Sequence, residues 1–117
     1  MHRFKELQVW KSSRLFCKSI YEITANFPDN EKFGLVSQLR RASVSIASNI
    51  AEGASRRSNK DFYRFLEIAI GSAYEIETQL LIATDLGFMN EMGSQKLLDE
   101  LQSIVKMLSK LMSSLKR

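Results

Sequence analysis

Seven apolar residues recur at alternating four- and three-residue steps through the middle of the chain. They are Phe62, Leu66, Ala69, Ala73, Ile76, Leu80 and Ala83. This spacing places one continuous apolar face along a long helix, which must bury that face against other helices to be stable. Ser58 and Asp61 resemble a capping box at its start, and Gly87 is a suitable left-handed cap at its end. The pattern therefore predicts a helix over residues 59–86.

Three further segments have helical apolar periodicity, over residues 7–26, 33–54 and 91–115. An early Gly93 leaves the start of the last helix open between Asn90 and Ser94. The expected core positions of these helices are Val9, Ser13, Phe16, Ile20, Ile23 and Phe27; Leu35, Leu39, Ala42, Ile46, Asn49 and Gly53; and Leu98, Leu101, Val105, Leu108, Met112 and Leu115.

The chain contains few residues that break helices. There is one proline, Pro28, and five glycines in 117 residues, too few for the many turns of a β-sandwich or barrel. Short connections between consecutive helices favour antiparallel neighbours. The sequence therefore predicts an all-α protein: a single up-down-up-down antiparallel four-helix bundle spanning residues 1–117 as one domain.

The residue types needed for most catalytic and metal sites are missing. His2 is the only histidine, which argues against Ser-His-Asp and Cys-His sites, a histidine-containing di-iron centre and zinc sites. No glycine-rich phosphate-binding motif is present. Glu52 and Glu75 interrupt apolar stretches, and we expect a structural ion pair with an arginine of the second or third helix there, with a carboxylate metal site or catalysis as alternatives. The sequence thus indicates no enzyme, no cofactor and no metal.

The expected location is the cytoplasm. No apolar run approaches the roughly 20 residues that span a bilayer, so we expect no membrane association. No hydrophobic signal segment is seen at the N-terminus. The single cysteine, Cys17, cannot form an intramolecular disulfide, which suits a reducing compartment.

Positive charge is concentrated on the predicted hairpin of the second and third helices, in a chain with a net charge of +4. The cations are Arg40, Arg41, Arg56, Arg57, Lys60 and Arg64. Several of them crowd the start of the third helix, where the helix dipole disfavours positive charge. This excess suggests an anionic partner such as RNA or DNA. The alternative is that these arginines are solvated or that Arg40 or Arg41 pairs with Glu52 or Glu75.

The predicted third helix carries a second apolar stripe, about a quarter-turn from the first. Its members are Tyr63, Ile70, Tyr74 and Leu81. The stripe either widens the core or faces another subunit, and tyrosines are enriched at such interfaces. We take these four residues as a candidate homo-oligomer interface.

The chain resembles a known bacterial family, the four-helix-bundle 23S rRNA intervening-sequence proteins, also called S23 ribosomal proteins. The resemblance runs from Phe4, Leu7, Val9 and Trp10 through Gln38-Leu39-Arg40-Arg41-Ala42, Ser45-Ile46 and Asn49-Ile50-Ala51-Glu52-Gly53 to Arg57-Ser58, Phe62, Arg64-Phe65-Leu66, Ile68-Ala69-Ile70-Gly71-Ser72, Glu75, Glu77-Thr78-Gln79-Leu80 and Leu86-Gly87-Phe88.

This resemblance implies an up-down bundle and a pentameric ring. It also extends to the accessory proteins of diversity-generating retroelements, which are basic pentamers that bind nucleic acid and partner a reverse transcriptase. By resemblance, Arg40, Arg41, Arg57 and Arg64 are candidate nucleic-acid contacts, whereas Arg56 and Lys60 rest on charge clustering alone.

Two functions remain open at this point. The first is a non-enzymatic, oligomeric protein that binds RNA or DNA through the basic patch with little sequence preference. The second is a protein–protein adaptor ring that docks a partner such as a reverse transcriptase.

Overall fold

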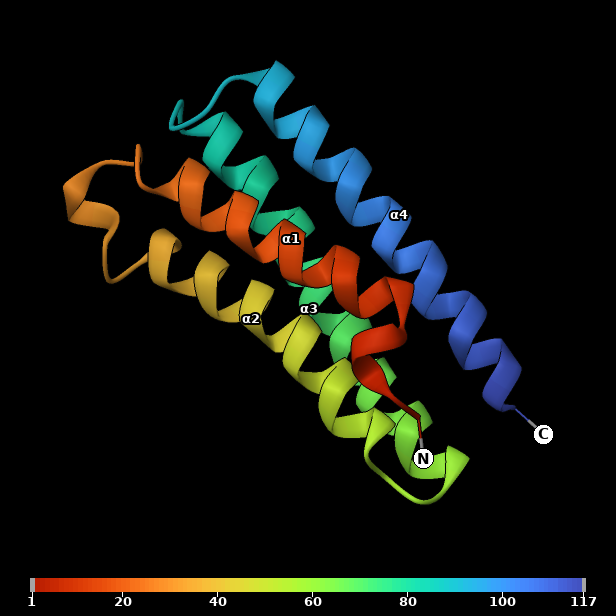
Figure 1. Ribbon diagram of the computed structural model, residues 1–117. Helices are drawn as coiled ribbons and strands as arrows, with labels where there is room; N and C mark the ends of the chain where they lie inside the picture. The colour runs from red at the N-terminus through yellow and green to blue at the C-terminus, as the bar shows by residue number, and fades with distance from the viewer. Residues whose placement is uncertain (1, 117) are drawn as a thin grey trace.

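The computed structural model describes residues 2–116 and contains four long helices and two short 3-10 turns in that range (Figure 1). The elements are η1 (Phe4–Glu6), α1 (Gln8–Thr24), η2 (Asp29–Glu31), α2 (Leu35–Ala54), α3 (Asn59–Asp85) and α4 (Glu91–Leu115). Each helix ends within two residues of the bounds expected from the sequence. Residues 2–116 form no strand, so the expected all-α class is confirmed.

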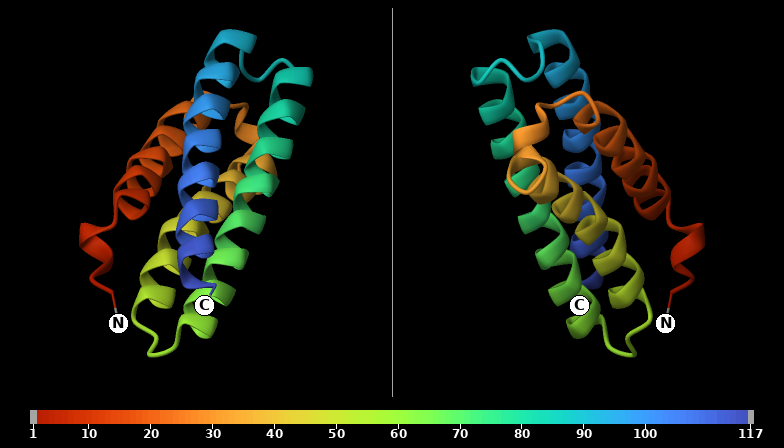
Figure 2. Two further views of the ribbon diagram at one scale, coloured as in Figure 1. Left: turned by 90° about the vertical axis from the view of Figure 1, so that its right-hand side faces the viewer. Right: turned by 90° about the vertical axis from the view of Figure 1, so that its left-hand side faces the viewer.

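The four helices form an elongated bundle of 45 × 23 × 20 Å (Figures 1 and 2). Each helix contacts two neighbours, because α1 packs on α2 and α4, and α3 packs on α2 and α4. Consecutive helices run in opposite directions, which confirms the up-down-up-down order. The chain termini therefore lie at the same end as the α2–α3 turn (Figure 2). Within residues 2–116, no helix combines the length and apolar character needed to cross a membrane.

The helix ends follow the expected capping chemistry in most respects. Ser58 Oγ accepts a hydrogen bond from the Asp61 backbone N–H at 3.1 Å, but the Asp61 carboxylate pairs with Arg64 rather than reaching back to Ser58. Asn90 Oδ1 accepts from the Gly93 N–H at 2.7 Å, which sets the start of α4 at Glu91. Gly87 has φ +78°, so the predicted left-handed cap is present after α3.

The core confirms the α3 stripe completely, since each of its seven residues is at most 1% exposed. The stripe expected on α4 is partly wrong: Leu97 and Ile104 are buried, whereas Leu98, Val105 and Met112 are half-buried. On this helix two apolar residues stand side by side at 97–98 and at 104–105, so the sequence leaves the register open by one position.

The stripes expected on α1 and α2 need similar corrections. On α1, Thr24 is buried at the position next to Ile23, which is the core residue expected from the sequence. The Thr24 hydroxyl can be buried without losing a hydrogen bond, because it donates to the Ile20 carbonyl at 2.7 Å. On α2, the expected Leu39, Ala42, Ile46 and Gly53 are buried, but Leu35 and Asn49 are half-buried and their neighbours Val36 and Ile50 are buried instead.

The closest helix pair is α2 and α3, and Gly53 explains how they approach. A Cβ atom added at Gly53 would lie 2.7 Å from Phe65 Cβ and 2.8 Å from Phe62 Cδ1. The Phe65 atom is the Cβ, which is fixed to the α3 backbone, and Phe62 is only 1% exposed, so both have little room to move. Glycine is therefore required at this position by the packing of the two helices.

We predict that Gly53→Ala destabilises the protein by about 1–3 kcal/mol, because the new methyl group forces α2 and α3 apart. Gly71→Ala is the matched control, since a Cβ there meets nothing within 4 Å. The control should be stabilising by about 0.5–1 kcal/mol, as expected for alanine replacing glycine inside a helix. Urea unfolding of both variants measures the difference, and equal free energies of unfolding would contradict the packing account.

Candidate nucleic-acid interface

The α2–α3 turn, residues 55–58, is held at both ends by hydrogen bonds. Ser55 Oγ donates to the Glu52 carbonyl at 2.6 Å, and the Arg56 backbone N–H donates to the Gly53 carbonyl at 3.0 Å. The Ser58 cap then begins α3. Arg56 and Arg57 consequently sit in a short turn with a defined backbone, and both residues are exposed.

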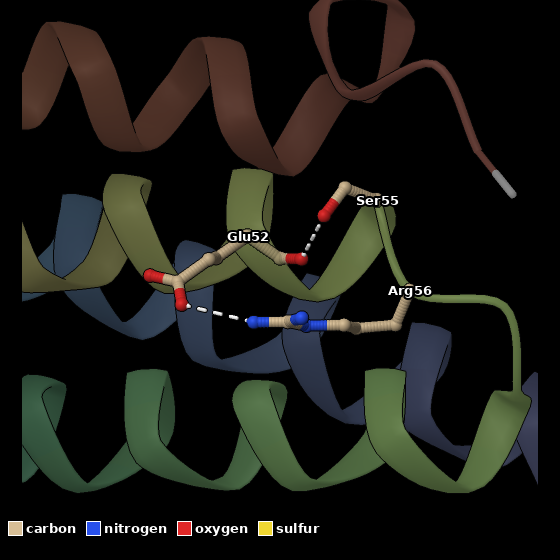
Figure 3. Close-up of polar contacts among 3 residues, drawn as sticks. All are labelled: Glu52, Ser55 and Arg56. Carbon is tan, nitrogen blue, oxygen red and sulfur yellow. Dashed lines mark hydrogen bonds and ion pairs between the residues drawn. The ribbon is translucent and has the colours of Figure 1, made fainter.

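The Arg56 side chain lies back along α2 rather than projecting into solvent (Figure 3). One of its guanidinium nitrogens is 3.2 Å from Glu52 Oε2, and the guanidinium lies 4.8 Å from the centroid of the Phe65 ring. The sequence predicts an ion pair for Glu52, and the structure has one, although its partner is in the turn rather than on a helix. Because both side chains are about half exposed, the ion pair contributes at most about 1 kcal/mol.

The next three cations differ in their partners. Arg57 and Lys60 are exposed and have no carboxylate within 4.0 Å among the described residues. Arg64 lies 3.8 Å from Asp61 with its side chain 70% exposed. Lys60 and Arg64 line a pocket of about 320 Å³ whose wall also includes Tyr63 and, from the end of α4, Lys116.

The antiparallel fold brings further cations to this end of the molecule. The backbone N–H of His2 donates to the Ala54 carbonyl at 2.9 Å, which ties the N-terminal segment, with Arg3 and Lys5, to the end of α2. The ammonium of Lys116 lies 5.8 Å from the centroid of the Tyr63 ring. We call this surface the basic end, and it comprises Arg3, Lys5, Arg56, Arg57, Lys60, Arg64 and Lys116.

Sequence reasoning missed Arg3, Lys5 and Lys116, because they are far from the hairpin in the chain. The predicted up-down topology could have identified these three residues, because it places both ends of the chain beside the α2–α3 turn (Figure 2).

Acidic residues neutralise the basic end only in part. Arg3, Arg56 and Arg64 each pair with a carboxylate, from Glu6, Glu52 and Asp61 respectively. The cations with no carboxylate within 4.0 Å in the described chain are Lys5, Arg57, Lys60 and Lys116. Asp61 is the only acid in the first turn of α3, so the unpaired charges add to the positive end of that helix.

Arg40 and Arg41 do not join the basic end. They lie about 22–24 Å from Arg56 along α2, at 1.5 Å per residue. Arg40 is half-buried; its Nε donates to Thr24 Oγ1 at 2.9 Å, one Nη donates to the Tyr21 carbonyl at 3.3 Å, and the guanidinium lies 4.6 Å from the Tyr21 ring centroid. Arg40 therefore joins α1 to α2.

Arg41 is exposed and lies on the α3 side of α2, whereas Arg40 lies on the α1 side. Arg41 lines a polar pocket there with Glu75 of α3. Within residues 2–116 neither Arg40 nor Arg41 has an ion pair with Glu52 or Glu75.

The second stripe of α3 divides between core and surface. Tyr63 and Ile70 are half-buried against the core, whereas Tyr74 and Leu81 are 56% and 49% exposed. Tyr74 lines a groove between α3 and α4 together with Leu98 and Val105, which are half-buried residues of α4. An apolar surface thus remains on the α4 flank of α3.

Comparisons with known proteins agree on one family. The family model described as 23S rRNA-intervening sequence protein matches residues 5–110. A solved structure of a protein of unknown function from the S23 ribosomal protein family of Bacteroides thetaiotaomicron is 26% identical, with a TM-score of 0.78, covering 93% of this chain and 99% of that chain. No curated protein is significantly similar to the chain.

We predict that Arg40 and Arg57 differ sharply in their contribution to stability. Arg40→Ala should lower the free energy of unfolding by about 1–2 kcal/mol, because it removes two hydrogen bonds and a cation–π contact. Arg57→Ala should change it by less than about 0.5 kcal/mol, as expected for an exposed side chain without partners. Urea unfolding measures the free energy of unfolding of both variants. Equal losses of stability would show that Arg40 stabilises the fold no more than Arg57 does.

Proposed function

The chain belongs to the 23S rRNA-intervening sequence protein family, and from that premise we propose that it is a non-enzymatic, oligomeric protein that binds RNA or DNA through its basic end. One observation carries the proposal: four exposed cations, Lys5, Arg57, Lys60 and Lys116, lie at one end of the bundle with no carboxylate partner within 4.0 Å in the described chain. Such cations attract the phosphate backbone and supply most of the sequence-independent binding energy.

The surroundings of these cations favour phosphate contacts over base reading. The start of α3 adds partial positive charge, and backbone N–H groups at such a helix start bind phosphate oxygens. The aromatic rings at this end are only partly available, because Phe65 lies under Arg56 and Tyr63 packs against the core. Because these two rings are largely occupied by contacts within the chain, we expect little stacking of bases on them and little sequence preference.

Self-association is the second part of the proposal. Tyr74 and Leu81 present large exposed apolar surface on α3, beside the groove that Tyr74, Leu98 and Val105 line. Exposed apolar patches of this kind mark protein interfaces. A ring of several copies, pentameric by family resemblance, would repeat the basic end and raise avidity for a polyanion without new contacts.

The same groove supports an alternative function. If its occupant is a different protein, the chain is a protein–protein adaptor that docks a partner such as a reverse transcriptase. The exposed Tyr74 and Leu81 favour this function as much as self-association, so the mass of the purified protein separates the two.

We predict that labelled single-stranded RNA binds the protein at low salt, with affinity falling steeply as salt rises. Contacts from the four unpaired cations of one chain give a slope of about −3 in a plot of log affinity against log salt. Arg57→Glu/Lys60→Glu should abolish most of this binding. The variant should fold normally, since a glutamate in the first turn of α3 suits the helix dipole. Fluorescence anisotropy over a salt series provides the measurement.

Lys18→Glu/Lys32→Glu is the matched control for that experiment. Both lysines are exposed, and they lie in α1 and in the α1–α2 connection, away from the basic end. The control changes the net charge by the same amount and should retain most of the RNA affinity. Equal losses in the two variants would mean that net charge alone drives binding, and unchanged anisotropy for wild type at low salt would refute nucleic-acid binding.

We also predict that the protein self-associates at micromolar concentration, so that its mass in solution is at least twice the 13.4 kDa of one chain. Tyr74→Arg/Leu81→Arg should reduce it to a monomer with unchanged helicity, because two buried charges without partners destabilise an interface. Light scattering coupled to size-exclusion chromatography measures the mass. A monomeric wild type would contradict self-association and leave the groove to another partner.

A further inference from the structure

A second polar surface runs along the outer groove between α2 and α3. On α2 it is formed by residues at steps of three and four, namely Gln38, Arg41, Ser45, Asn49 and Glu52. The α3 side contributes Ser72, Glu75 and Gln79. This groove lies on the flank of α3 opposite the α3–α4 groove, and none of the functions proposed above uses it.

The groove deepens into a pocket of about 180 Å³ at Arg41 and Glu75. Its other lining residues are Gln38, Ala42, Ser45 and Ser72. The pocket is smaller than the roughly 300–1,000 Å³ that holds a whole drug-sized ligand, so it suits a single monomer unit or chemical group. Arg41 and Glu75 both line it, yet neither side chain has an oppositely charged partner within 4.0 Å among residues 2–116.

The hydrogen bonds around the pocket leave donors free. Ser45 Oγ accepts from Asn49 Nδ2 at 3.0 Å and from Ser72 Oγ at 2.9 Å, so its own proton remains available. Gln38 Oε1 accepts from Gln79 Nε2 at 3.2 Å, which leaves the Gln38 amide group as a donor. Gln79 itself is only 7% exposed, and its Oε1 atom has no partner.

These groups match a ligand that has an anionic oxygen beside a hydrogen-bond donor. Arg41, with the free Ser45 and Gln38 donors, suits a phosphate, since arginine and small polar side chains are frequent phosphate partners. Glu75 is an acceptor only, and it suits a hydroxyl group close to that phosphate. A ribose-phosphate unit carries both groups.

We propose that this pocket holds one ribose-phosphate unit of a single-stranded RNA, with the phosphate at Arg41 and the 2′-hydroxyl donating to Glu75. The inference rests on the proposed nucleic-acid binding and makes it specific for RNA. DNA lacks the 2′-hydroxyl, so its backbone would leave the Glu75 carboxylate without a donor and close to a phosphate.

The groove also connects the pocket to the basic end. Arg56 pairs with Glu52 and thereby neutralises the only acid of α2 between the turn and the pocket. Asn49 and Ser45 follow, and Arg41 lies about 22 Å from Arg56 along the helix. A strand bound at the basic end therefore has an uncharged, hydrogen-bonding path to Arg41.

The test compares three labelled oligonucleotides of one sequence by anisotropy: RNA, DNA and 2′-O-methyl RNA. Wild type should bind RNA about fivefold to tenfold more tightly than the other two, as expected for the net contribution of one solvent-exposed hydrogen bond. Glu75→Ala should reduce that preference to less than about twofold, chiefly by weakening RNA binding. Arg41→Ala should weaken RNA and DNA together. Glu22→Ala, an exposed residue of α1 that lines neither groove, is the charge-matched control and should keep the preference.

Several outcomes would overturn the inference. Equal wild-type affinity for RNA and DNA would refute it while leaving the proposed function intact, and so would a Glu75→Ala variant that keeps the RNA preference. The absence of binding to all three oligonucleotides would refute both. A nuclear magnetic resonance titration with adenosine monophosphate separates the sources of the ligand: shifts at Ser45 and Ser72 without RNA binding would assign the pocket to a free nucleotide and overturn the RNA strand as its occupant.

Discussion

Gly53 of α2 lies so close to Phe62 and Phe65 of α3 that no side chain fits between the two helices. Further along the same interface, Ser45 and Ser72 are joined by a 2.9 Å hydrogen bond, as are Gln38 and Gln79 at 3.2 Å. Small residues such as Gly53, Ser45 and Ser72 let the two helices approach closely. The narrow spacing allows a four-residue turn to connect α2 to α3, and it forms the floor of the polar groove. Both surfaces that carry our proposals therefore depend on the packing of one helix pair.

The cations at the basic end are not explained by stability. Arg57 and Lys60 stand at the positive end of α3, where like charge is unfavourable by a few tenths of a kcal/mol each. The ion pairs beside them are exposed and contribute little. Hydrogen bonds from Ser55, from the Arg56 backbone N–H and to Ser58 hold the turn, and the exposed arginine side chains add little to them. The local structure thus tolerates the positive charge, which is the arrangement expected where an anionic partner rather than the fold requires it.

The sequence alone predicted the architecture because α3 has one unbroken apolar stripe of seven residues, and a helix with such a stripe must bury it against other helices. It was less informative on α4, where the apolar pair at 104–105 offers two registers and only the three-dimensional packing selects Ile104. Charge clustering in the sequence likewise predicted Arg57 and Lys60 as candidate phosphate contacts, but it could not distinguish these unpaired cations from Arg40, whose side chain is hydrogen-bonded within the fold. That residue differs only in having Thr24 and Tyr21 within reach, and these contacts depend on how α1 crosses α2.

The two flanks of α3 suit different tasks, and their geometry makes them compatible. The apolar surface around Tyr74 and Leu81 faces the α4 side, whereas the groove with Arg41 and Glu75 faces the α2 side. Self-association in which neither contact surface includes the second flank would leave that flank open. In a cyclic assembly, rotation about one axis keeps equivalent ends of every copy at the same height. The basic ends would then form one ring of positive charge, and each groove would lead away from that ring. A single strand held by several ends at once would gain avidity from positions that bind weakly alone.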